Sequence, residues 1–322
     1  MHAIHYFEKL LERGMPVLVD DTRHLPFLAR RGFSARALAG FDFGSTVEQP
    51  AFIIFSESAA HEAFLQRWGE IPGITAHLSL AKFDTSAEMI EYSIDQFLGI
   101  DMPATLARRS AYYEAILSCD SAEVVAPHGP LRCSMGDSVE IANRDDEMEP
   151  GWLYSVSEFL ETSLVNIECD RSTFCLDGEF AFDGLIYLFN NPELRGQVGW
   201  MLEEWVRLAS RGGNAATLVG NSVTRLTLGG HDRTEQLIAL TRGKERQSAA
   251  TEFAFGCVEY DLRAQDWSRN SVMHESFWGV HVGIGMGQEI PHFDLIARRA
   301  ECRYLNLETA TSAEPAALMS AP

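Results

Sequence analysis

Residues 279–294 read GVHVGIGMGQEIPHFD, and this stretch decides how the second half of the chain folds. Apolar residues alternate with small or polar ones in its outer parts, which predicts two short strands over 278–284 and 291–297. The glycines and the proline between them are typical of a turn. Because a strand projects residues two apart from the same face, we expect His292 and Asp294 to lie side by side.

Further polar side chains occur in segments that otherwise look like buried strands. His281 lies in the first strand, among glycines that leave room beside the backbone. Glu252 lies in the apolar run ATEFAFG, where a charged carboxylate is costly unless it is paired or binds a metal ion. Glu158 and Glu161 lie upstream in LYSVSEFLETSL. These residues are the candidates for a common polar site.

Two imidazoles and two or three carboxylates form a donor set that suits zinc, manganese, cobalt or iron. Two histidines and one carboxylate with open positions also suit an iron that activates oxygen. The alternative interpretation is that these side chains only pack the fold. A phosphate-binding loop at 283–287 is disfavoured because no helix follows it and Pro291 interrupts. A catalytic serine is disfavoured because the chain lacks a G-x-S-x-G motif.

The region around this stretch predicts a β-rich domain over 130–306. Short segments bounded by turn residues predict its strands, at 133–142, 164–170, 178–189, 216–228, 252–260, 278–284, 291–297 and 300–306. One helix over 192–210 interrupts them, with Leu194, Val198, Met201, Trp205 and Leu208 at three- and four-residue steps. We interpret this stripe as core packing. The small, polar tail at 307–322 is expected to be disordered.

The N-terminal part alternates strand-like and helical segments, which favours an α/β domain over 1–125. Strands are expected at Pro16–Asp20, Ala51–Phe55 and Ile74–Leu80. Helices are expected at His61–Glu70, Ser86–Leu98 and about Pro103–Ser118. No glycine fingerprint for a dinucleotide is present, so no organic cofactor is expected there. The domain is interpreted as a scaffold or a cover for substrate.

Composition and charge restrict the partners. The net charge of −20 disfavours binding to nucleic acid, which requires basic patches. No apolar run approaches the roughly 20 residues of a membrane helix, and the N-terminus lacks the core of a signal peptide. We therefore expect a cytoplasmic protein that does not bind membranes. The six cysteines contain no C-x-x-C pair and are interpreted as reduced thiols.

The order of these segments from about 133 to 306 resembles the leucyl aminopeptidase T-like metallopeptidases, including their relative 2,5-dihydroxypyridine 5,6-dioxygenase. SVSEFLETSLV resembles the family's glutamate-bearing strand, and ATEFAFG its E-L-G-I-G pattern. WGVHVGIG resembles the family's G-T-x-H-x-A-x-G pattern, and PHFD its terminal H-x-D. The first 120 residues match in kind, as an α/β domain of reduced size.

The resemblance implies a metal site whose ligands are Glu158, Glu252, His281, His292 and Asp294. Glu161 aligns nearly as well as Glu158, and whichever of the two the metal leaves free is expected to be the catalytic base and acid. The peptidases hold two ions and the dioxygenase one iron. The resemblance therefore implies a hydrolase acting on a peptide or small amide with zinc, manganese or cobalt, or else a ring-cleaving dioxygenase with Fe(II). It also implies a homodimer.

Three departures from the family pattern support a different role. The position where the peptidases have a tyrosine is Gln288, the loop between His281 and His292 is short, and the helix at 192–210 looks inserted. A member altered in this way can keep the cleft and lose the reaction. It would then bind a peptide or another substrate, with or without metal, in a peptide-modification or natural-product pathway.

Overall fold

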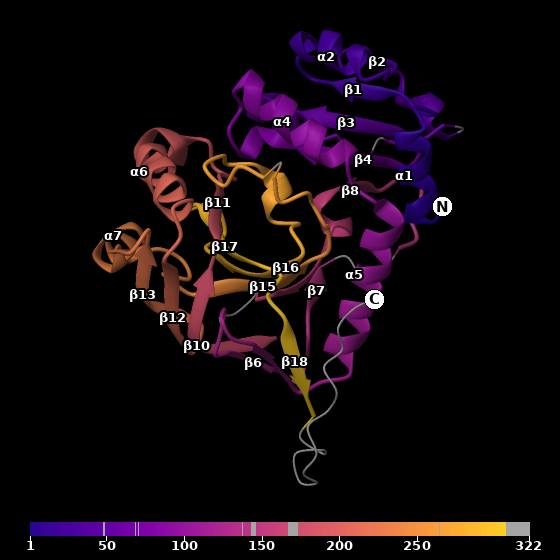
Figure 1. Cartoon of the computed structure of the whole chain (residues 1–322). Coiled ribbons are helices and arrows are strands. Elements are labelled where there is room, and N and C mark those ends of the chain that lie inside the picture. Colours follow the sequence, from indigo (N-terminus) through magenta and orange to yellow (C-terminus); the bar gives the residue numbers. More distant parts are fainter. Residues whose placement is uncertain are drawn as a thin grey trace. The chain divides into compact units, whose positions relative to one another are not determined.

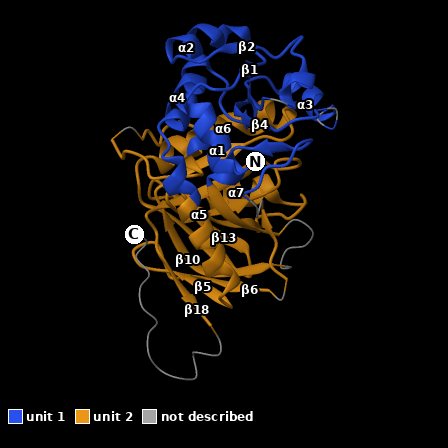
Figure 2. Cartoon of the chain, turned by 90° about the vertical axis from the view of Figure 1, so that its right-hand side faces the viewer, with its two compact units in different colours: residues 1–106, 143–160, 271–273 blue, residues 107–142, 161–270, 274–322 orange. Residues whose placement is uncertain are grey.

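The computed structural model describes residues 1–47, 49–67, 69, 71–136, 138–142, 146–166, 173–263 and 265–306. The chain divides into two compact units, shown in blue and orange in Figure 2. Unit 1 contains residues 1–106, 143–160 and 271–273, and unit 2 contains 107–142, 161–270 and 274–322. The sequence predicts a division at 125–130, and the two compact units are interleaved along the chain, with 143–160 and 271–273 in unit 1. The predicted disordered tail, 307–322, lies outside the described residues.

Unit 1 is an α/β domain with a parallel sheet, as its alternating strand and helix patterns predict (Figure 1). Its strands occur in the order β2-β1-β3-β4-β8, and every neighbouring pair is parallel. Their bounds are β1 Val17–Val19, β2 Ala35–Ala37, β3 Ala51–Phe55, β4 Thr75–Ser79 and β8 Leu153–Ser155. The apolar runs VLV and AFIIF are buried throughout, which suits strands covered on both faces.

The structure has helices near the three predicted positions of the N-terminal part, and two further helices before them. They are α1 Ala3–Leu11, α2 Leu25–Arg30, α3 Ser58–Leu65, α4 Ala87–Leu98 and the first turn of α5 Met102–Leu117, whose remainder belongs to unit 2. Ser86 caps α4 by accepting a hydrogen bond from the Met89 amide. Met89, Ile90 and Ile94 form its buried face. Short 3-10 helices also occur, at η1 Thr22–His24, η2 Phe43–Val47, η4 Leu80–Lys82, η5 Ser157–Phe159 and η6 Val272–His274.

Unit 2 is built on two antiparallel sheets. The seven-stranded sheet has the order β14-β13-β12-β10-β6-β5-β18, with bounds β5 Ser121–Val124, β6 Leu131–Met135, β10 Phe174–Phe182, β12 Asn214–Val219, β13 Ser222–Leu228, β14 His231–Asp232 and β18 Cys302–Leu305. The six-stranded sheet has the order β11-β17-β16-β15-β9-β7, with bounds β7 Ile141–Ala142, β9 Glu161–Val165, β11 Gly184–Leu188, β15 Ala250–Gly256, β16 Gly279–Ile284 and β17 His292–Arg298. The predicted β-rich second half is confirmed.

Two predicted strands, 133–142 and 178–189, are each two strands that belong to different sheets: β6 and β7 in the first, β10 and β11 in the second. The break falls at Asp183, between β10 and β11. The Asp183 carboxylate accepts hydrogen bonds from the backbone amide and the guanidinium of Arg298, and its own amide donates to Ile296. These interactions fix a corner that neither sheet could accommodate within a straight strand.

Two helices complete unit 2, α6 Glu193–Ala209 and α7 Thr234–Thr241. The apolar stripe of α6 packs in the core, which confirms the interpretation of its Trp and Met residues. Trp205 is fully buried and its indole donates a hydrogen bond to Gln236 on α7. The five described cysteines are free thiols, and Cys169 lies outside the described residues. Within the described part of the chain, no helix has the length and apolar character that a membrane crossing requires.

Candidate metal site

Four neighbouring strands of the six-stranded sheet, β9, β15, β16 and β17, carry the candidate donors on one face. In the sheet register, Gly283 is paired with Glu252 on one side and with Asp294 on the other. His281 is two residues before Gly283, and His292 two residues before Asp294, so both imidazoles project from this same face. The H-x-D spacing places His292 and Asp294 on one face of β17, and this face continues across the adjacent strands to His281 and Glu252.

The opposite face of these strands is the core of unit 2. Phe253, Val282, Phe293 and Leu295 alternate with the polar residues and are fully buried. Their packing fixes the position and rotation of each strand, because a slip of one residue would exchange the two faces. The same alternation that buries the apolar side chains therefore holds the donors in place.

The donors form two overlapping groups. Glu161, Glu252 and His281 make the first group, and Glu252, His292 and Asp294 the second; in each, the donor atoms lie within 4.8 Å of one another. His281 Nε2 is 3.6 Å from Glu161 Oε2 and 3.7 Å from Glu252 Oε1. His292 Nε2 is 3.4 Å from Glu252 Oε2 and 3.0 Å from Asp294 Oδ1. Glu252 belongs to both groups and offers one oxygen to each histidine.

Burial makes this concentration of acid costly unless positive charge balances it. His281 and Asp294 are buried, and Glu161, Glu252 and His292 are largely buried. Burial opposes the charged form of Glu252, but hydrogen bonds and charges from His281 and His292 outweigh it and hold the pKa of its carboxyl well below the usual range. Burial likewise opposes protonation of His292, yet Asp294 and Glu252 raise the pKa of its imidazole well above the usual value. The site therefore attracts a cation.

The hydrogen bond of the other His292 nitrogen decides which nitrogen faces the carboxylates. His292 Nδ1 lies 2.8 Å from the carbonyl oxygen of Gly285, so a proton on Nδ1 is donated to that carbonyl. Nε2 then presents its lone pair to the carboxylates of Asp294 and Glu252. This arrangement is favourable only if a second proton or a metal ion lies between them. Metal-binding histidines commonly donate their other N–H in this way, which fixes the tautomer.

Gly283 provides space at the centre of the donor face. A Cβ at this position would lie 2.7 Å from His292 Cε1, 2.8 Å from Asp294 Oδ1 and 2.9 Å from the Glu252 Cβ. Any other residue would push the donors apart. The sequence predicts that glycines in this strand leave room beside the backbone, and at Gly283 the donor side chains occupy that room.

Ser163 supports Glu252 and was not among the residues singled out from the sequence. It lies on β9, is buried, and its hydroxyl donates a hydrogen bond to Glu252 Oε1. The available signal was its position two residues after Glu161 on a predicted strand, which places both side chains on one face. This hydroxyl orients the carboxylate that both donor groups share.

The donor set fits a divalent transition metal. Ligands at 2.0–2.2 Å from a tetrahedral ion lie about 3.4 Å from one another. The separations between donor atoms of 3.0 to 3.7 Å in the two groups agree with this spacing. Nitrogen and oxygen donors, with no thiolate among them, suit zinc, manganese, cobalt or iron.

The structure distinguishes the two candidate glutamates. Glu161 begins β9 and belongs to the first donor group. Glu158 lies in the 3-10 helix η5 of unit 1 and belongs to neither group. The ligand set expected from the resemblance is thus brought together at four positions, with Glu161 rather than Glu158 beside them. Gln288 lies exposed in the turn between β16 and β17, and its carbonyl accepts a hydrogen bond from the Asn191 side chain, just before α6.

Two solved structures are similar to this chain over most of its length. Wild-type AmpT from Thermus thermophilus superposes with a TM-score of 0.50 at 9% identity, over 91% of this chain and 90% of that one. The 2,5-dihydroxypyridine dioxygenase from Pseudomonas putida KT2440 gives 0.45 at 12% identity, over 94% of both chains. At such low identity, the AmpT comparison establishes the fold alone, and this fold agrees with the expected aminopeptidase T-like architecture. No curated protein matches the chain by sequence.

The sequence also matches a family model over residues 12–305, that of the crocagin biosynthetic protein CgnE/B. The match covers both units, so the chain belongs to this family. The family description names a biosynthetic protein, and the donor groups described above lie within the matched residues.

Proposed function

We propose that this member of the CgnE/B family is a divalent-metal-dependent hydrolase that cleaves a peptide or amide bond in a biosynthetic pathway. One observation carries the proposal: five buried or largely buried donors meet in two groups that share Glu252. Three carboxylates with two neutral imidazoles carry three negative charges, so one divalent ion leaves the group negative and two make it positive. The shared carboxylate suits a pair of ions better than a single one.

The residues divide into binding and proton-carrying roles. His281 and Glu252 would hold one ion, with Glu161 beside them, and His292, Glu252 and Asp294 would hold the other. A divalent ion supplies Lewis acidity here: it polarises a carbonyl group and makes water more acidic. Ser163 and the Gly285 carbonyl keep Glu252 and His292 oriented while the substrate binds.

Glu161 is the carboxylate best placed to carry a proton. Its side chain is 12% exposed, whereas that of Asp294 is 2% exposed. Glu252 is slightly more accessible but contacts both histidines and Ser163, so its oxygens are already engaged. A base must take a proton from water and return it to the leaving amine. We therefore propose Glu161, at the edge of the donor face, for the role that the sequence left open between Glu158 and Glu161.

The test is elemental analysis of the untagged protein after incubation with zinc, manganese, cobalt or ferrous ions, followed by assays on amide and peptide substrates. Two ions per chain together with hydrolysis support the proposal. The double variant His292→Ala/Asp294→Ala should lose metal while remaining folded. His231→Ala/Asp232→Ala is the matched control, since this exposed pair on β14 should retain metal. Equal retention in both variants would refute the site assignment.

A second candidate function is binding of a peptide or amide substrate without catalysis. The observation that favours it is Gln288, which stands where the related peptidases have a tyrosine. A protein that binds the substrate but hydrolyses nothing, with or without metal, would support this function. One iron per chain with oxygen consumption would instead support the ring-cleaving alternative.

A further inference from the structure

Strand β15 carries one extra residue, Thr251, immediately before the glutamate that both donor groups share. The register between β15 and β16 shifts at this point, so Thr251 lies between the paired residues Ala250 and Glu252 and forms a β-bulge. Ala250 packs in the core and Glu252 carries donor oxygens, although residues two apart in a regular strand share a face. A bulge redirects the side chains around it and is common beside active sites. The side chain of Thr251 is therefore available for a role at the donor face.

The hydroxyl of Thr251 contacts the carbonyl group that orients His292. Thr251 is buried, and its Oγ1 donates a hydrogen bond to the carbonyl oxygen of Gly285 at 2.8 Å. His292 Nδ1 lies 2.8 Å from the same oxygen. A carbonyl oxygen has two lone pairs, so it can accept from both donors at once. The position of this one oxygen atom therefore links Thr251 to the rotation of the imidazole ring.

Gly285 begins the turn between β16 and β17, and the next residues of that turn are tied to the segment before α6. The Asn190 side chain donates to the Met286 carbonyl at 2.8 Å, and the Asn191 amide donates to the Gly287 carbonyl at 2.9 Å. Gly285 itself has a φ of 83°, a conformation that glycine adopts without strain. Three consecutive carbonyl groups of the turn therefore accept hydrogen bonds, and the first of them serves the candidate metal site.

We propose that Thr251 is a positioning residue of the metal site. It holds the Gly285 carbonyl at the place where the His292 imidazole directs its Nδ1–H, so that Nε2 stays turned towards Asp294 and Glu252. Groups that support a metal ligand in this way typically contribute about 10- to 100-fold to metal affinity. This role rests on the proposed metal site, but it does not require that the protein hydrolyses a substrate.

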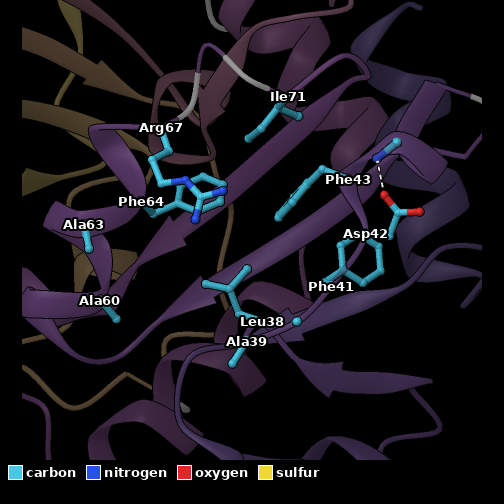
Figure 3. A pocket seen from close by; sticks show the side chains of 12 residues that line it. Leu38, Ala39, Phe41, Asp42, Phe43, Ala60, Ala63, Phe64, Arg67 and Ile71 are labelled. Atoms are coloured by element: carbon cyan, nitrogen blue, oxygen red, sulfur yellow. Dashed lines mark hydrogen bonds between the residues drawn. The ribbon is translucent and has the colours of Figure 1, made fainter.

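The support lies entirely within unit 2. Thr251, Gly285 and His292 all belong to this unit. Figure 3 shows a cavity of about 560 Å³ in unit 1, between the segment 38–44 and α3, and none of the three residues lines it. A ligand in that cavity is therefore not required for the role of Thr251, and the protein can be tested without any added organic ligand.

The first measurement is the zinc affinity of the full-length protein, by competition with a chelator. Thr251→Val keeps the size of the side chain and removes the hydroxyl, so affinity should fall by about 10- to 100-fold. Thr251→Ala should show the same loss without placing a methyl group against the carbonyl, and Thr251→Ser should restore the affinity. The matched control is Thr241→Val, because Thr241 is similarly buried and its hydroxyl donates to the Leu237 carbonyl on α7. Its zinc affinity should equal that of the wild type.

The second measurement needs no metal. In zinc-free protein with isotope-labelled histidine, NMR detects the Nδ1–H proton of His292, which is assigned by its absence in His292→Gln. Exchange of this proton with water should be faster by about fivefold or more in Thr251→Val, because the acceptor carbonyl loses the hydrogen bond that fixes it. Exchange should be unchanged in Thr241→Val and close to the wild-type rate in Thr251→Ser.

Unchanged zinc affinity or unchanged proton exchange in Thr251→Val would overturn the proposal. Equal losses in Thr241→Val, or no recovery in Thr251→Ser, would do the same, because the effect would then not come from the hydroxyl of Thr251. If the wild type binds no zinc, the proposed function fails, and exchange of the His292 proton alone decides whether Thr251 orients the imidazole.

Discussion

Each unit of the molecule contains a pair of largely buried histidines, and the two pairs differ in the groups that surround them. In unit 1, the rings of His61 and His77 lie 5.3 Å apart, next to Phe55, and the charge of Lys82 acts on both. In unit 2, carboxylates surround His281 and His292. Burial of histidine alone therefore does not make a metal site in this protein.

The surroundings shift the pKa values of the histidines in opposite directions in the two units. Burial lowers the pKa of His61 to about 4, with a contribution from Lys82, and lowers the pKa of His77 to about 3, with contributions from His61 and Lys82. At His292 burial acts in the same direction, but Asp294 and Glu252 reverse it and raise the pKa. Unit 1 thus keeps its histidines neutral, whereas unit 2 draws positive charge to them.

The largest expected effect comes from removing the shared carboxylate. Glu252→Gln should abolish the binding of both ions, lowering affinity by more than the 10- to about 100-fold loss typical of a supporting residue. Glu161→Gln should reduce the stoichiometry to one ion, because it belongs to a single group. Calorimetric titration with zinc or manganese measures both values. The exposed Glu193→Gln should behave as wild type, and two ions bound to Glu252→Gln would contradict the proposal that both ions depend on Glu252.

A methyl group at the centre of the donor face should have the next largest effect. Gly283→Ala brings its Cβ within 3 Å of His292, Asp294 and Glu252, so metal affinity should fall by about 10- to 100-fold. The matched control is Gly196→Ala on the exposed side of α6, where a Cβ meets nothing within 4 Å. That change should leave affinity intact and stabilise the helix by up to about 1 kcal/mol. Equal affinity in both variants would show that the donors do not need the space.

The neutral pair of unit 1 should make that unit sensitive to acid. His77 titrates near 6.5 when unfolded and near 3 when folded, so the unfolded chain binds the proton first. The contribution of neutral His77 to the free energy of unfolding is complete above pH 6.5. It is lost as the pH falls towards 3, by about 1.4 kcal/mol per pH unit. Hydrogen exchange of peptides from 75–79, corrected for intrinsic rates, measures this loss. In His77→Leu the slope between pH 6 and about 4 should decrease by one proton; an unchanged slope would assign the acid sensitivity to other groups.

The smallest expected effect comes from placing a carboxylate beside a histidine of unit 1, as carboxylates lie beside the histidines of unit 2. The Ser79 hydroxyl lies 3.3 Å from His61 Nδ1, so Ser79→Asp places a carboxylate beside a neutral histidine. The pKa of His61 should rise from about 4, as that of His292 is raised by Asp294. NMR titration of the imidazole signals measures the shift. Ser79→Asn, which has the same shape without charge, should leave the pKa of His61 near its original value.

Much of the fold could be predicted from local sequence patterns. The strand at Ala51–Phe55 and the α6 stripe follow from apolar composition and from a 3.6-residue period, which depend on nearby residues alone. The exchange of sheets at Asp183 could not be predicted, because the groups that fix the corner come from Arg298 and Ile296, over a hundred residues later. The assignment of 143–160 to unit 1 likewise depends on the pairing of β8 with β4.

The candidate site divides in the same way. The spacing of His292 and Asp294, and the cost of burying Glu252 in an apolar strand, were visible in the sequence because strand alternation is a local rule. The choice between Glu158 and Glu161 was not, since residues three apart share a face in a helix but not in a strand. The structure forms a 3-10 turn at Glu158 and begins β9 at Glu161.

The sequence by itself therefore determined which residue types were available for metal chemistry, and on which kind of element each lies. Only the tertiary structure decided that Glu252 lies between the two histidines, that Gly283 separates the donors, and that Ser163 orients the shared carboxylate. The physical reason is that these relations depend on the register of four strands distant in sequence, and the packing of their buried faces sets that register.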